Sequence, residues 1–66
     1  MRGKHHYTII LHTIYDHYEC EEPNKEEILF QTNKRAIAEL YVAEHSYLEE
    51  YDSDWFYKFL ELRKDY

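Results

Sequence analysis

Hydrophobic and polar positions alternate along residues 6–18, which is the pattern of a β-strand. The face that carries the better core candidates consists of Tyr7, Ile9, Leu11, Thr13, Tyr15 and His17. Residues 19–27 are acidic and contain a Pro-Asn turn pair, and the short run "ILFQT", residues 28–32, predicts a second strand. Together these segments predict an antiparallel hairpin with an acidic loop.

A helix is predicted for residues 33–51, with Thr32 or Asn33 as its N-cap. Its apolar positions fall near one face at three- and four-residue spacing, and they are Ile37, Leu40, Tyr41, Tyr47, Leu48 and Tyr51. A "DSD" segment breaks this pattern before a second predicted helix over residues 54–64. One continuous bent helix over residues 33–64 is the alternative, because neither Gly nor Pro interrupts the segment.

These elements predict a single α+β domain over residues 1–66, in which an antiparallel hairpin is packed by two helices in ββαα order. A domain of this length buries only about 60% of the surface of its unfolded chain, so its core needs support from another source. The single cysteine, Cys20, excludes an internal disulfide. Eight Tyr, three Phe and one Trp supply bulk instead, and such residues are also enriched in protein interfaces.

The short second strand leaves part of the first strand without a partner. With a loop at about 20–25, Phe30 would face Tyr15 and the second strand would end opposite Thr13. An unpaired apolar strand promotes aggregation unless it is covered, so we expect a homodimer in which residues 6–12 of two copies extend the sheet. The expected dimer interface contains Tyr7, Ile10, His12 and Ile14. Coverage of this edge by a helix and fraying of the strand are the alternatives.

The histidines do not converge on a metal site within one chain. His12 and His17 are five residues apart and point to opposite faces of a regular strand. A metal shared across a dimer by His12, His17 and Cys20 is the alternative. Adjacent helix residues such as His45 and Ser46 point about 100° apart and do not form a nucleophile–base pair. We therefore expect a non-enzymatic protein with no cofactor and no metal.

The beginning of the chain, "MRGKHHYTII", has no apolar run of signal-peptide length. No stretch of the chain approaches 18 apolar residues, so no membrane span is expected. With a single cysteine, these features predict a soluble protein of the cytoplasm.

The net charge of −6 is concentrated in the hairpin loop and at the junction of the two predicted helices. We expect these acids and the aromatic residues near them to bind a partner, through Glu44, Glu49, Glu50, Asp52, Asp54, Tyr47, Tyr51, Trp55, Glu19, Glu21 and Glu22. Lys and Arg are sparse and scattered, which disfavours direct binding of nucleic acid. The charge favours a protein partner with a basic surface. The alternative is that the acids only keep the protein soluble.

These features predict a small acidic protein-binding protein that inhibits its target by steric and electrostatic blocking. The target would be a host or defence protein that handles nucleic acid, since such proteins have basic surfaces. In type, a short acidic single-domain chain looks like the small accessory inhibitors encoded by phages and other mobile elements. The alternative is a structural or regulatory homodimeric adaptor, or an antitoxin-like module, whose acidic surface is incidental.

Overall fold

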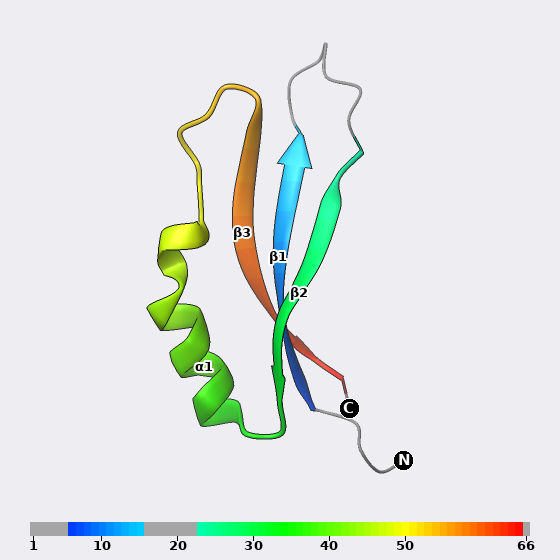
Figure 1. Cartoon of the computed structure of the whole chain (residues 1–66), viewed down its shortest axis with the longest axis vertical. Coiled ribbons are helices and arrows are strands. Elements are labelled where there is room, and N and C mark those ends of the chain that lie inside the picture. Colours follow the sequence, from blue (N-terminus) through cyan, green and yellow to red (C-terminus); the bar gives the residue numbers. More distant parts are fainter. Residues whose placement is uncertain (1–5, 16–22, 66) are drawn as a thin grey trace.

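The computed structural model describes residues 6–15 and 23–65 of the chain. These residues form a three-stranded antiparallel sheet and one α-helix (Figure 1). The elements are β1 (Tyr7–Tyr15), β2 (Lys25–Thr32), α1 (Arg35–Glu44), the short 3-10 helix η1 (Ser46–Leu48) and β3 (Phe56–Lys64). The predicted α+β class is confirmed, whereas the predicted ββαα order is wrong at its last element.

β1 is the central strand of the sheet, which has the order β2-β1-β3. Apolar residues on both of its alternating faces suit this place, because the neighbouring strands on its two edges shield side chains on either face. Ile9 lies opposite Phe30 of β2 and Leu62 of β3. Its side chain is fully buried and forms the core together with Tyr7 and Ala38. The predicted core face of this strand is therefore confirmed at Tyr7 and Ile9.

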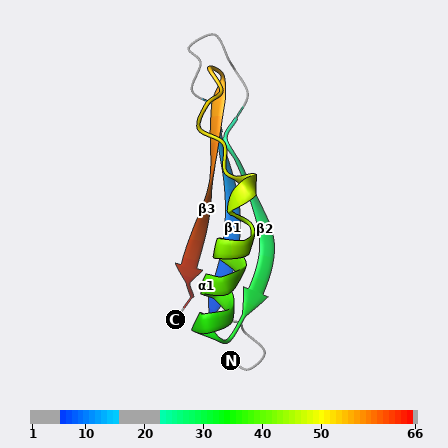
Figure 2. The ribbon, with the colours of Figure 1, turned by 90° about the vertical axis from the view of Figure 1, so that its left-hand side faces the viewer.

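α1 lies across one face of the sheet, in front of β1 and between the two outer strands (Figure 2). The helix residues that pack against the core are Ala38, Tyr41 and Val42. Their three- and four-residue spacing places them on one side of the helix. The Tyr41 ring stacks on Phe30 of β2, with 4.6 Å between the ring centroids.

The helix is shorter than predicted and begins after Lys34, which occupies the N-cap position. The Thr32 hydroxyl accepts the N–H of Lys34 at 3.2 Å, so it supports the turn that precedes the helix and does not cap the helix itself. In the described part of the chain, no helix combines the length and apolar character that a membrane span requires.

Residues 56–64 form a strand, so the predicted helix over residues 54–64 is wrong, and so is the alternative of one continuous helix. β3 pairs with β1 along its whole length. In a short apolar run the helical and strand patterns overlap, and aromatic residues favour strands. Residues 56–64 adopt the strand conformation because they pair with the edge of β1 that β2 leaves open.

The register of β1 against β2 also differs from the prediction, because β1 ends at Tyr15 and the segment between the strands begins earlier in the chain than expected. Phe30 lies opposite Ile9 and not opposite Tyr15, and β2 begins at Lys25. β1 is therefore paired on both edges from Tyr7 to Thr13. This pairing removes the basis for a homodimer in which the edge of β1 meets a second copy.

The residues expected at that dimer interface have other places in the fold. Tyr7 belongs to the core beneath α1, and Ile10 and His12 are buried on the opposite face of the sheet. Ile14 is half-buried on that opposite face. Residues 16–18 of the predicted strand lie outside the described residues.

Ile9→Ala should lower the free energy of unfolding by about 2–5 kcal/mol, because it opens a cavity in the core. Ile28→Ala is the matched control, since this side chain of β2 is 62% exposed, and it should cost less than about 1 kcal/mol. Urea unfolding followed by circular dichroism measures both values. Equal losses in the two variants would contradict this placement of the core.

Candidate functional site

The face of the sheet opposite α1 carries a network of polar side chains. The Nε2 atom of the buried His12 lies 2.5 Å from Glu61 Oε1, and its Nδ1 atom lies 3.7 Å from Glu26 Oε2. The His12 ring stacks on Phe59 of β3, with 4.7 Å between the ring centroids. A histidine ring thus lies between two carboxylates on the face that α1 does not cover.

Arg63 holds Glu61 from the same strand. Its Nε and Nη2 atoms donate hydrogen bonds of 3.1 Å to the two carboxylate oxygens of Glu61. The hydrogen bond from Arg63, and after it the one with His12, lowers the pKa of Glu61 below its ordinary value. The carboxylate in turn raises the pKa of Arg63. The network therefore favours the ionised forms of both residues.

We assign this network a structural role. Every buried side-chain nitrogen and oxygen among the described residues has a hydrogen-bond partner. Over the same residues, no group of three His, Cys, Asp or Glu side chains is arranged to hold a metal ion. His17 and Cys20, the alternative metal ligands, lie outside the described residues.

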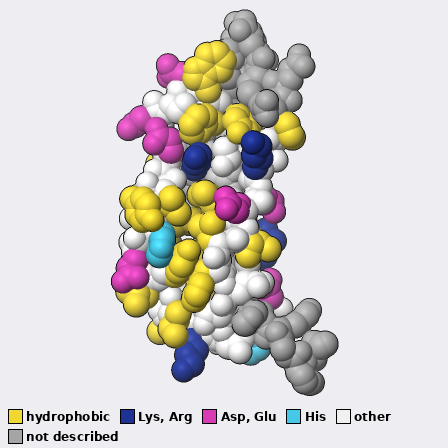
Figure 3. Space-filling model, viewed as in Figure 1, with side chains coloured by type: hydrophobic (Ala, Val, Ile, Leu, Met, Phe, Trp, Pro, Cys, Tyr) yellow, Lys and Arg dark blue, Asp and Glu magenta, His cyan; other side chains and the backbone are white. Residues whose placement is uncertain are grey.

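The connection between α1 and β3, residues 45–55, exposes three large aromatic side chains. Tyr47, Tyr51 and Trp55 are 74%, 63% and 53% exposed. Figure 3 shows hydrophobic side chains gathered along this side of the molecule, with acidic side chains at its margin. Aromatic side chains that gather on a surface are typical of protein interfaces.

Tyr47 lies at the end of a series of neighbouring rings that begins at the core. Phe30 stacks on Tyr41, and Tyr41 stacks on His45 with 3.8 Å between the ring centroids. The Nδ1 atom of His45 lies 2.9 Å from the backbone oxygen of Tyr41, which orients the imidazole at the end of α1. The Tyr47 ring follows at 5.8 Å from His45. The exposed tyrosine therefore has one tilted ring neighbour, His45, which is itself stacked on Tyr41.

Two glutamates attach the connection to the outer edge of β3. The backbone N–H and C=O of Glu50 form hydrogen bonds of 3.1 and 2.8 Å with Lys58. The Glu49 carboxylate accepts the N–H of Leu60 at 3.0 Å. These bonds occupy backbone groups that an outer strand would otherwise leave unpaired. The Glu49 side chain faces β3, so we leave it out of the candidate site.

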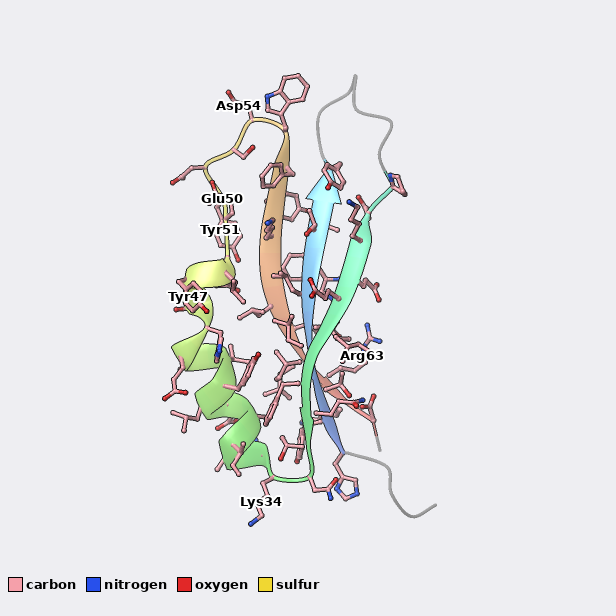
Figure 4. The ribbon with its side chains drawn as sticks, in the orientation of Figure 1. Lys34, Tyr47, Glu50, Tyr51, Asp54 and Arg63 are labelled. Atoms are coloured by element: carbon pink, nitrogen blue, oxygen red, sulfur yellow. The ribbon has the colours of Figure 1, made fainter. Side chains whose placement is uncertain are left out.

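Glu50, Asp52 and Asp54 add negative charge to the connection. All three are exposed, and none forms an ion pair with another described residue. Figure 4 shows that the labelled residues of the connection lie along one side of the molecule. We call the following set the acidic-aromatic surface: Tyr47, Glu50, Tyr51, Asp52, Asp54 and Trp55.

Most of the described residues that were predicted to bind a partner lie on this surface. Glu44 is exposed but belongs to the C-terminal end of α1. Outside the described residues lie Glu19, Glu21 and Glu22. The sequence predicts Ile37 and Leu40 on the same apolar helix face as Tyr41, whereas both side chains are exposed on α1. The sequence does indicate that some apolar side chains of this helix must be exposed, because apolar residues occur on all of its sides.

No family model, curated protein or solved structure matches the chain.

Glu49→Ala should speed hydrogen exchange of the Leu60 amide about tenfold or more, because this amide loses its acceptor. Glu50→Ala is the matched control, since Glu50 binds Lys58 through its backbone and should leave the Leu60 amide unchanged. Exchange followed by NMR spectroscopy measures both rates. If the Leu60 amide exchanges equally fast in the two variants, Glu49 does not anchor the connection.

The lowered pKa of Glu61 predicts a loss of stability in acid. The ionised side chain stabilises the folded state above its ordinary pKa of 4.5, and this contribution disappears as the pH falls through the lower folded-state pKa. Between about pH 5 and pH 2, the unfolding midpoint of the unaltered chain should therefore fall more steeply than that of Glu61→Gln. Parallel curves of midpoint against pH would contradict the role of the Arg63 and His12 contacts.

Proposed function

We propose that this chain is a small non-enzymatic protein-binding protein and that the acidic-aromatic surface is its binding part. The observation that carries the proposal is the exposure of Tyr47, Tyr51 and Trp55 on a connection that hydrogen bonds attach to β3. Large aromatic side chains are the residues that most often dominate binding energies at interfaces. A surface held in place before binding also loses less conformational entropy than a free loop.

The charge of the surface favours a partner with a basic face. Glu50, Asp52 and Asp54 have no ion-pair partner among the described residues, so Lys and Arg side chains of a partner would complement them. Proteins that handle nucleic acid carry such faces, because they neutralise phosphate groups. Binding to such a face would block nucleic acid sterically and would also repel it through the negative charge of this chain. On this ground we propose an inhibitor of a host or defence protein.

The aromatic residues and the carboxylates would have separable roles in this inhibition. The rings would be buried in the contact and set the lifetime of the complex. The carboxylates would act earlier, because unscreened charge raises the rate of encounter with an oppositely charged surface. Removal of a ring and removal of charge should therefore have different effects on the kinetics.

The triple variant Glu50→Gln/Asp52→Asn/Asp54→Asn should reduce capture of the partner by about tenfold or more. The full chain is tethered and incubated with an extract of its native cells at about 0.05 M salt, and mass spectrometry quantifies the captured proteins. Raising the salt to about 0.5 M should release the same protein, because the Debye length shrinks.

The control variant, Glu26→Gln/Glu27→Gln/Glu39→Gln, removes the same charge from another part of the chain. Both triple variants change the net charge from −6 to −3, so a general effect of charge would be equal in the two. We expect the control to capture the partner as the unaltered chain does. Equal losses in the two variants would contradict the assignment of the binding surface.

A further inference from the structure

α1 carries apolar residues around its whole circumference. Seven of the ten residues in RAIAELYVAE are apolar, and the charged ones are Arg35, Glu39 and Glu44. A surface helix normally presents a polar face to water, and a helix that is apolar all round is normally covered on every side. Ala38 is nevertheless the one buried residue of this helix. The outer face of α1 therefore has the composition of a contact surface.

Ala36, Leu40 and Ala43 form the middle of this outer face, and Ile37 lies beside them. Leu40 is 56% exposed and Ile37 is 42% exposed. Two alanines beside one leucine allow a second helix to approach closely, because its own large side chain can pack over the alanines. The side chains of this face therefore suit contact with another helix.

The charges at the two ends of α1 oppose the helix dipole. The N-terminal end favours acids but carries Lys34 and Arg35, and the C-terminal end favours cations but carries Glu44. Arg35 is paired with Glu39 at 2.8 Å, whereas Lys34 and Glu44 form no ion pair within the described residues. Figure 4 places Lys34 at the end of α1 that is remote from Tyr47. An antiparallel helix would bring an opposite charge to both ends.

We infer that the outer face of α1 binds the same face of a second copy, with the two helices antiparallel across a two-fold axis near Leu40. The face is self-complementary, because the two-fold axis places the basic end of each helix beside the acidic end of the other. Lys34 of each copy lies near Glu44 of the other, and Leu40 and Ile37 are buried between the helices. The contact uses α1 and leaves the connection from Glu50 onward to other partners.

Leu40→Glu should convert the dimer to a monomer, because it places two carboxylates beside the two-fold axis. Sedimentation equilibrium of the full chain should give twice the chain mass of 8.3 kDa for the unaltered protein and the single mass for the variant. Leu40 is more than half exposed, so the variant should fold, which circular dichroism verifies. Tyr51→Glu introduces the same charge at an exposed position outside α1 and should leave the dimer intact.

Charge reversal tests the antiparallel arrangement. Lys34→Glu or Glu44→Lys alone should weaken the dimer about tenfold, although each change improves the interaction with the dipole of its own helix. The double variant Lys34→Glu/Glu44→Lys should recover most of the affinity, because the exchanged charges again meet across the axis.

Three results would overturn the inference. The first is a single chain mass for the unaltered protein at every concentration up to its solubility limit. The second is a dimer that persists in Leu40→Glu. The third is a double variant whose dimer affinity is no higher than that of the single variants. The protein is measured alone in these experiments. Failure of the dimer is therefore distinguishable from failure of the proposed partner binding, which depends on Glu50, Asp52 and Asp54.

Discussion

The pairing of β1 on both edges is the constraint on which the rest of the structure depends. Among the described residues, β1 is the first strand and β3 is the last, so the sheet forms only when segments far apart in the sequence meet. This closure buries Ile9 between Phe30 and Leu62. It also directs the path between β2 and β3, because α1 must cross the sheet before the connection returns along β3 (Figure 1). Such long-range pairing requires a large loss of chain entropy before it is stabilised by contacts.

The candidate surfaces follow from that path and from the small size of the core. The buried hydrophobic residues of the described chain are Tyr7, Ile9, Ile10 and Ala38. A domain this small cannot cover all of its apolar side chains, and the large ones left exposed lie on β2, on α1 and on the connection. The hydrogen bonds of Glu49 and Glu50 pair part of the outer edge of β3 and also attach the connection that carries the exposed rings. The segment that completes the sheet edge is therefore also the one that carries the proposed binding surface.

The sequence predicts the elements whose pattern is local. Alternation identifies the core face of β1 and helical spacing identifies the centre of α1. The clustering of acids with aromatic residues points to the candidate surface, but residues 45–51 were predicted to be helical, so the connection itself was not predicted. β3 is not predictable in this way, because its residues fit both periods and the Ser53 hydroxyl accepts the N–H of Trp55 much as a helix N-cap would. The sequence does indicate an unpaired edge on β1, but it does not distinguish a second copy from a distant strand of the same chain. Nor does it reveal that Glu49 faces a backbone N–H and not water.

If the carboxylates of the connection steer the chain to a basic partner, the rate of association must depend on ionic strength. The most direct test is the association rate constant for the captured partner, measured by stopped-flow fluorescence of the exposed Trp55. We expect this constant to fall at least about tenfold between about 0.05 and 0.5 M salt, while the dissociation rate constant changes much less. An association rate constant that is the same at both salt concentrations would contradict electrostatic steering by the acidic-aromatic surface.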